Sequence, residues 1–311
     1  MNIGFIPAKT AWLEPNREAL IDVHSGRRVS FGELDQNTCR LANALVDQLG
    51  LSKGDRVAVL SKNSIEYMEI YYACARVGLI AQPINWRLGL DEMVRILDDG
   101  SPSVVISSDD YCEQIEKLKD KIDVPHWLNF GDGGDGSYEA LLKSSTVTEP
   151  SASADIGGDD PVLILYTGGT TGQSKGALHS HHSLYMGMIN QTVAERVVPS
   201  DIYMLTGQMF HIPVALGMNY HAHGCPMVLI NFDARLALET IERERVSAFL
   251  GITTMLNWMM ADAKFDEFDL SSLRNIQYGG GPMPSTVVAA ALASFPCTII
   301  QGYGQTEGMT M

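Results

Sequence analysis

Short apolar runs alternate with amphipathic stretches along most of the chain. Residues 56–61 (RVAVLS) and 103–108 (SVVISS) are brief apolar runs that predict buried strands, and residues 79–85 (LIAQPIN) read similarly. Between these runs, residues 64–78 and 90–100 carry apolar side chains at helical spacing. Strands that alternate with helices of about 10–15 residues indicate βαβ units and a mostly parallel sheet.

The same alternation returns after residue 160. The predicted strands are 161–166, 202–206, 226–230, 247–250, 274–278 and 298–302, with helices between them, for example over 233–246 and 284–295. Residues 131–160 interrupt the rhythm because Gly, Ser, Asp and Pro dominate there, with one possible helical turn in YEALLK. We expect an α/β fold with this segment as a surface excursion.

Composition restricts the possible functions more than it restricts the fold. The chain has 311 residues, 45% of them hydrophobic, without a run long enough for a membrane helix or a secretory signal, so a cytoplasmic location is the default expectation. Its five cysteines are widely spaced, which disfavours a disulfide framework or a zinc site. The formal net charge of −15, without a basic run, argues against nucleic-acid binding.

The densest chemical signal is LYTGGTTGQSKGALHSHH, residues 165–182, which follows an apolar run. Glycines allow close backbone approach, hydroxyls add donors, and Lys175 adds a positive charge, so the segment suits phosphate oxygens. It does not match the G-x-x-x-x-G-K-[ST] loop of Walker-type NTPases, because Ser174 precedes the lysine and Gly176 follows it. The histidines at its end, His179, His181 and His182, are expected to form the solvated start of a helix and not a metal site.

The loop resembles the phosphate-binding signature of the adenylate-forming superfamily, which includes acyl-CoA synthetases, luciferase and peptide-synthetase adenylation domains. The family pattern is approximately Y-T-S-G-T-T-G-x-P-K-G, and this chain departs from it where Gly168 replaces Ser and Ser174 replaces Pro. We expect the second change to loosen the loop. The segments GDRVAVLSKNSIEY, PINWRLGLDEM, YGGGPMP (278–284) and QGYGQTEG (301–308) resemble further family motifs, in family order.

The resemblance implies a division into subdomains. One α/β subdomain would cover residues 50–190 and carry the phosphate-binding loop, and residues 1–49 plus 195–311 would form a second one with the adenine and magnesium motifs. The nucleotide would lie between them. The family's β-barrel part and its C-terminal domain, which carries a catalytic lysine, are expected to be missing, so the chain is predicted to be a fragment that is inactive alone and able to self-associate as a homo-oligomer.

The resemblance also implies the chemistry: a carboxylate attacks the α-phosphate of ATP in the presence of Mg²⁺, and coenzyme A then accepts the acyl group. Lys175, Thr306, Glu307 and His211 are the expected catalytic residues, with Glu307 as the Mg²⁺ ligand. The expected nucleotide-binding residues are Thr167, Gly168, Gly169, Thr170, Thr171, Gly172, Lys175, Gly279, Gly280, Gly281, Pro282, Gly302, Tyr303, Gly304 and Thr306.

The segment LTGQMFHIPVALGM bears on the acid. Amino-acid-activating relatives usually carry Asp after the corresponding Phe, to pair with the substrate ammonium, whereas this chain has His211 after Phe210. The acid is therefore expected to lack an α-amino group and to be fatty or otherwise hydrophobic. The expected pocket wall consists of Met209, His211, Gly217, Gly251, Thr254 and Met255.

Two alternatives remain open from the sequence. The protein could form an acyl-adenylate and load it on a carrier protein instead of coenzyme A, or it could be a non-catalytic nucleotide-binding relative. The identity of the acid, the acceptor, the oligomeric state and the pathway are not decided by the sequence.

Overall fold

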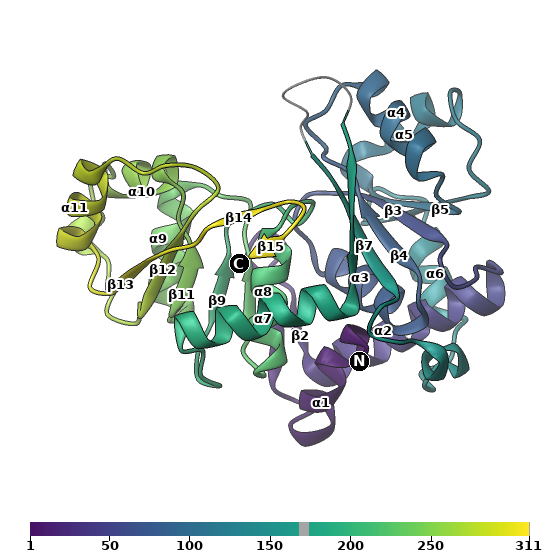
Figure 1. Cartoon of the computed structure of the whole chain (residues 1–311), viewed down its shortest axis with the longest axis horizontal. Coiled ribbons are helices and arrows are strands. Elements are labelled where there is room, and N and C mark those ends of the chain that lie inside the picture. The colour runs from purple at the N-terminus through teal and green to yellow at the C-terminus, as the bar shows by residue number, and fades with distance from the viewer. Residues whose placement is uncertain (168–173, 311) are drawn as a thin grey trace. The chain divides into compact units, whose positions relative to one another are not determined.

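The computed structural model describes residues 1–167 and 174–310. The chain forms two compact units (Figure 1). Unit 1 consists of Met1–Arg17 and Phe31–Tyr185, and unit 2 of Glu18–Ser30 and Met186–Met311. Each unit has its own sheet.

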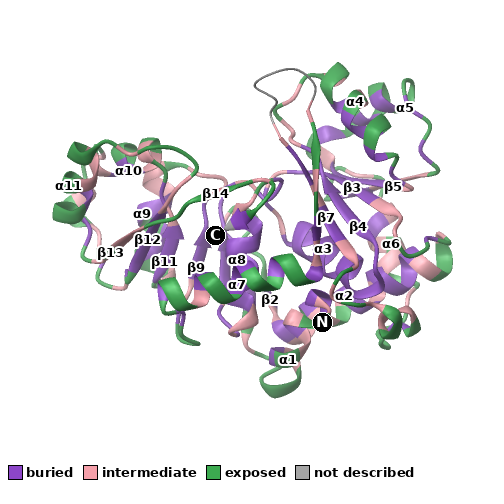
Figure 2. Ribbon diagram, in the orientation of Figure 1, coloured by how far each residue is buried: buried purple, intermediate pink, exposed green. Residues whose placement is uncertain are grey.

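The sheet of unit 1 has six strands in the order β6-β5-β3-β4-β7-β8. Their bounds are β3 Arg56–Leu60, β4 Ile80–Pro83, β5 Val104–Ser108, β6 His126–Phe130, β7 Pro161–Tyr166 and β8 Gly176–Ser180. The first five strands in this order run parallel, and β8 pairs antiparallel with β7. Strands β3, β4 and β5 are buried, as Figure 2 shows, which explains why they read as continuous apolar runs.

Helices complete unit 1. They are α1 Ile6–Leu13, α2 Phe31–Asn43, α3 Ile65–Val77, α4 Leu90–Gly100, α5 Cys112–Lys119 and α6 Ser137–Lys143, with the short turns η1 Ile3–Phe5, η2 Ala44–Gln48, η3 Asp109–Tyr111 and η4 Ser151–Asp155. Every residue of α3 is buried; Ser64 caps its start by accepting from the Tyr67 amide at 3.2 Å, and Gly78 ends it with a φ of 76°. Helix α3 is thus the central helix of this unit.

The sheet of unit 2 has seven strands in the order β13-β12-β11-β9-β10-β1-β2. Their bounds are β1 Glu18–Asp22, β2 Arg28–Ser30, β9 Tyr203–Leu205, β10 Met227–Leu229, β11 Ala248–Leu250, β12 Asn275–Tyr278 and β13 Thr298–Gln301. All neighbours pair in parallel except β1 and β2. A separate antiparallel pair, β14 Gly304–Gln305 and β15 Met309–Thr310, follows β13.

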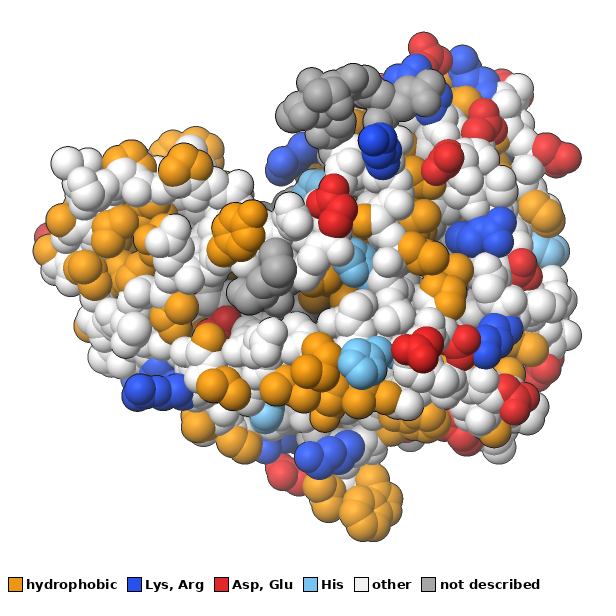
Figure 3. Space-filling view, viewed as in Figure 1, with side chains coloured by type: hydrophobic (Ala, Val, Ile, Leu, Met, Phe, Trp, Pro, Cys, Tyr) orange, Lys and Arg blue, Asp and Glu red, His pale blue; other side chains and the backbone are white. Residues whose placement is uncertain are grey.

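The helices of unit 2 are α8 Pro213–Ala222, α9 Ala234–Glu244, α10 Thr253–Met260 and α11 Ser285–Ser294, with the turn η5 Phe265–Glu267; helix α7, His181–Glu195, begins in unit 1 and ends in unit 2. Buried side chains of α9, α10 and α11, such as Ile241, Leu256 and Ala291, form one core with Val228 and Ile276 of the sheet. The outer faces of α10 and α11 expose apolar side chains, among them Trp258 and Leu292 (Figure 3).

The predicted fold class, two α/β units with mostly parallel sheets flanked by helices, is confirmed. The boundaries differ from the predicted ones, because residues 1–17 and 31–49 lie in unit 1, where α2 packs against both α1 and α3. Only residues 18–30 of the N-terminal segment join unit 2, where β1 pairs with β10 across more than 200 residues of sequence. Among the described helices, none is long and apolar enough to cross a bilayer.

Candidate functional site

The ends of the predicted phosphate-binding loop are held by a strand pair. Strands β7 and β8 run antiparallel up to the pair Tyr166 and Gly176, and beyond it the Thr167 amide donates to the Lys175 carbonyl at 3.0 Å. The Lys175 side chain is exposed. The predicted contacts of Gly168, Gly169, Thr170, Thr171 and Gly172 lie outside the described residues.

Tyr166 and Gly176 form a close contact at this point. A Cβ added at Gly176 would lie 2.7 Å from Cδ1 of Ile164 and 3.2 Å from Cζ of Tyr166, so a larger residue would have to displace these side chains. The Tyr166 hydroxyl donates to Oδ2 of Asp99, the penultimate residue of α4, at 2.7 Å. Burial raises the pKa of Tyr166, and the hydrogen bond with Asp99 raises it further, so the phenol stays protonated as a donor.

The three histidines after the loop differ from the prediction in how far they are buried. The expected helix does begin at His181, but His179 and His181 are buried, and only His182 is exposed. Nδ1 of His181 accepts a hydrogen bond from the Ile3 amide at 3.1 Å, which ties η1 to the start of α7. Strand β8 and the N-terminal segment bury this region, a long-range effect that local polarity does not reveal.

The remaining described candidates lie in unit 2, and four of them follow strands that end at one edge of its sheet. Strands β9, β11, β12 and β13 are parallel neighbours, so their carboxyl ends lie at the same edge. The segments that follow these strands contain His211, Gly251, Gly279 and Gly302. In open α/β sheets, ligands characteristically bind outside the carboxyl ends of the strands.

The loops after β12 and β13 are joined closely. The Gly302 amide donates to the Tyr278 carbonyl at 2.8 Å, and a Cβ on Gly279 would lie only 2.6 Å from the Gly302 carbonyl oxygen. Gly280 has a φ of 74°, a region that side chains disfavour. Pro282 and Gly281 of the same loop are exposed, and so is Tyr303, with 70% of its surface accessible. An exposed aromatic ring and exposed glycine backbone are groups that suit a flat ring system such as adenine.

Thr306 and Glu307 lie at the tip of a tight hairpin. Gly304 pairs with Thr310, and the Gly308 amide donates to the Gln305 carbonyl at 3.0 Å, so Thr306 and Glu307 take the two central positions of a β-turn. Thr306 is half-buried and Glu307 is exposed.

The residues predicted to line the acid-binding pocket differ in their exposure to solvent. His211 and Thr254 are exposed, Met255 is half-buried and Met209 is buried. The His211 ring meets the Phe210 ring edge-on, with centroids 4.5 Å apart, which orients the imidazole at the end of β9.

Gly217 and Gly251 each have a packing role. A Cβ at Gly217 would lie 2.6 Å from Cε of Met227, and one at Gly251 would lie 2.6 Å from Cδ2 of Leu256. These glycines allow α8 to approach β10, and β11 to approach α10. A side chain at either position would have to displace Met227 or Leu256, so these glycines contribute to packing whether or not they also line a substrate pocket.

Glu307 is the one described side chain that the sequence predicts as a metal ligand. No group of three or more His, Cys, Asp or Glu side chains suited to a metal occurs in the described part of the chain. Glu307 is an exposed carboxylate at a turn tip, and Mg²⁺ in nucleotide sites commonly binds one or two carboxylates together with waters and substrate phosphates. The residue present thus fits a substrate-bridged Mg²⁺.

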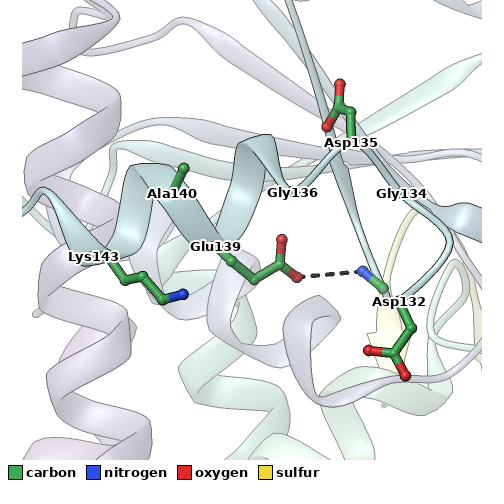
Figure 4. A pocket seen from close by; sticks show the side chains of 8 residues that line it. Asp132, Gly134, Asp135, Gly136, Glu139, Ala140 and Lys143 are labelled. Carbon is green, nitrogen blue, oxygen red and sulfur yellow. Dashed lines mark hydrogen bonds between the residues drawn. The ribbon is translucent and has the colours of Figure 1, made fainter.

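A surface hollow lies in unit 1, in the Gly- and Asp-rich excursion that the sequence predicts (Figure 4). It is lined by Gly131, Asp132, Gly134, Asp135, Gly136, Glu139, Ala140 and Lys143. The Gly131 amide donates to Oε1 of Glu139 at 3.3 Å, which closes the loop onto α6. This hollow contains none of the predicted site residues.

Comparison with known proteins identifies the family of this chain. The AMP-binding enzyme family model matches residues 8–311. The chain belongs to the AMP-binding enzyme family. The long-chain-fatty-acid–CoA ligase FadD13 of Mycobacterium tuberculosis is 32% identical over 308 residues, which cover 98% of this chain and 60% of that ligase. The fatty acid–[acyl-carrier-protein] ligase ScoC of Streptomyces coeruleorubidus is 30% identical over 302 residues, covering 94% of this chain and 56% of that protein.

Solved structures of AMP-binding enzymes agree with the fold. The inhibitor-bound N-terminal domain of FACL13 from Mycobacterium tuberculosis superposes with a TM-score of 0.91 at 30% identity, and the match covers 98% of this chain and 76% of that one. The chain therefore spans about three fifths of the length of the curated relatives to which it is compared.

Several residues that support the predicted candidates within each unit were not predicted from the sequence. Asp99 anchors Tyr166 from a separate helix, and Thr206 donates its hydroxyl to the Leu250 carbonyl, which joins the ends of β9 and β11. A Cβ on Gly207 would lie 2.4 Å from Cγ of Pro213, so glycine is needed where the chain turns toward α8. Their partners are distant in sequence or depend on the turn geometry, so no local motif marks them.

Proposed function

We propose that this chain carries the nucleotide- and acid-binding part of an ATP-dependent enzyme that activates a carboxylic acid as its acyl-adenylate and passes the acyl group to coenzyme A. The observation that carries the proposal is the edge of the unit 2 sheet. There the Gly302 amide donates to the Tyr278 carbonyl, Gly279 lies close to Gly302, and Tyr303 is exposed; the Thr306–Glu307 turn follows in the same chain segment.

Each group has a distinct role in the proposed first step. An oxygen of the acid attacks the α-phosphorus of ATP, and the bond from that phosphorus to the bridging oxygen breaks, so pyrophosphate leaves with the electron pair. Lys175 carries a positive charge for the departing phosphates, and Thr306 donates a hydrogen bond to an α-phosphate oxygen. Such preorganised donors stabilise the charge that develops in phosphoryl transfer.

Mg²⁺, when bound with ATP, would neutralise phosphate charge, and Glu307 is the residue that would hold it. Tyr303 would offer its ring face to adenine, with the Gly279–Pro282 backbone as the second wall. These assignments rest on the family membership and on the exposure of the side chains concerned.

The proposed acid is hydrophobic and lacks an α-amino group. His211 stands where a carboxylate would be needed to pair with a substrate ammonium, and a neutral imidazole does not supply that charge. The similarity to a protein named as a long-chain-fatty-acid–CoA ligase supports the same choice.

A carrier protein is the second candidate acceptor, because one relative of comparable similarity is named as a fatty acid–[acyl-carrier-protein] ligase. The two candidates share the adenylation step and differ only in the thiol that takes the acyl group. Incubating the protein, at its full natural length, with ATP and acid and with either coenzyme A or a phosphopantetheinylated carrier protein separates them by mass spectrometry of the thioester.

Two substitutions test the roles in adenylation. Lys175→Ala should lower pyrophosphate release by at least about 10-fold, because it removes a positive group that stabilises the transition state. Glu307→Gln should lower it by at least about 10-fold as well, because it removes the carboxylate charge of the proposed Mg²⁺ ligand. Unchanged release in both variants would remove these residues from the mechanism, and a wild type that binds ATP without releasing pyrophosphate would favour a non-catalytic relative.

A further inference from the structure

The Ser174 side chain closes the base of the predicted phosphate-binding loop. Its hydroxyl donates a hydrogen bond to the Thr167 carbonyl, on the opposite side of the loop. The Thr167 amide and hydroxyl both approach the Lys175 carbonyl, at 3.0 Å and 3.4 Å. Hydrogen bonds from side chains and backbone thus connect Thr167 with Ser174 and with Lys175, just beyond the last strand pair.

The lower part of this hairpin is already fixed without Ser174. Tyr166 pairs with Gly176, packs its ring near the Gly176 backbone and is anchored by Asp99. The Ser174 bond extends this frame by one residue on one side, to Thr167, and by two residues on the other, to Ser174. Lys175 lies directly between Ser174 and the fixed Gly176.

The family pattern has proline at the position of Ser174. Proline restricts the backbone through its ring and offers no side-chain donor. Serine lacks the ring restraint but can bond to the opposite strand, as it does here. The expectation that this serine loosens the loop is therefore not supported by the structure.

We infer that Ser174 is a positioning residue for the triphosphate: its hydroxyl bond to the Thr167 carbonyl holds the loop base, and with it the Lys175 side chain, in the conformation that receives the β- and γ-phosphates. The inference rests on the proposed function. The bond requires a hydroxyl at this position. Its effect should concern ligands that carry the outer phosphates and leave the acid side unchanged.

The test is equilibrium binding of ATP and of AMP to the protein at its full natural length. Ser174→Ala should weaken ATP binding by about 5-fold, the equivalent of one neutral hydrogen bond, while AMP binding stays within 2-fold. Ser174→Thr retains the hydroxyl and should restore ATP binding. Ser151→Ala, in the exposed turn η4 of the same unit, is the matched control and should leave both affinities unchanged.

Steady-state kinetics supply a second readout. Ser174→Ala should raise the KM for ATP and leave the KM for the acid unchanged, a split that general loss of structure would not produce. If Ser174→Ala binds ATP as the wild type does, or loses AMP binding to the same degree as ATP binding, the inference is overturned while the proposed function stands. If the wild type binds no ATP, the proposed function fails and the inference fails with it.

Discussion

The Tyr166 hydroxyl donates a 2.7 Å hydrogen bond to Oδ2 of Asp99, which links the last residue of β7 to the last turn of α4. Tyr166 is buried and Asp99 is exposed. A charge-assisted bond of this kind fixes the strand end from which the predicted phosphate-binding loop departs. The orientation of the loop base thus depends on a helix that lies more than 60 residues earlier in the chain.

Removing this hydroxyl should affect nucleotide binding more than stability. Tyr166→Phe keeps the ring that packs near Gly176 and leaves Asp99 hydrated, so we expect the midpoint of thermal unfolding to fall only slightly. The KM for ATP should rise by about 10-fold, near the lower end of what a lost hydrogen bond to a charged group costs. Tyr185→Phe, at an exposed tyrosine of the same unit, is the control and should match the wild type. An unchanged KM for ATP in Tyr166→Phe would show that the Asp99 link does not position the loop.

Gly279 should tolerate no side chain. In Gly279→Ala the new Cβ would meet the Gly302 carbonyl oxygen at 2.6 Å, so the ends of β12 and β13 would have to separate. We expect a loss of about 1–3 kcal/mol in the free energy of unfolding, the usual cost of overpacking, measured by urea denaturation. Gly281→Ala is the matched control two residues away, because its Cβ would meet nothing within 4 Å and its backbone is not left-handed. Equal stability of the two alanine variants would contradict this account of the loop.

His181 should make the N-terminal segment sensitive to acid. Burial lowers the pKa of His181 to about 4, below the ordinary value of 6.5, so the unfolded chain binds the proton more readily than the native one. The stability from neutral His181 is therefore fully present above pH 6.5 and is lost as pH falls through 4. Protonation of Nδ1 also removes the acceptor of the Ile3 amide.

Urea denaturation between pH 7 and pH 4 tests this directly. His181→Asn offers a non-titrating acceptor and should show a smaller loss of stability on acidification than the wild type, by up to about 3 kcal/mol over the whole range. His182→Asn, at the exposed neighbour, should follow the wild-type curve. Identical curves for wild type and His181→Asn would show that His181 does not contribute to the acid sensitivity.

Much of the fold could be predicted from local pattern. The apolar runs at 56–61 and 161–166 are strands in the structure because parallel strands buried on both faces need continuous apolar sequence. Helix α4 matches its predicted range, residues 90–100. The Gly-rich turns also marked correctly where strands of unit 2 end.

The parts that were missed depend on distant partners. Residues 1–17 and 31–49 join unit 1, where α2 packs against α1 and α3, which no local period reveals. Strand β8, rich in Gly, Ser and His, is a strand because β7 lies beside it. The burial of His181 and the bond from Ser174 to Thr167 likewise arise only once segments far apart, or on opposite sides of a loop, are brought together.

The most direct test of the central claim is ATP–pyrophosphate exchange by the protein at its full natural length, across carboxylic acids from acetate to long-chain, aromatic and polycyclic acids, with α-amino acids included. The account predicts exchange that depends on a hydrophobic acid without an α-amino group and that falls at least about 10-fold in Lys175→Ala and Glu307→Gln. Absence of exchange with every acid, despite measurable ATP binding, would contradict it, as would exchange supported by α-amino acids alone.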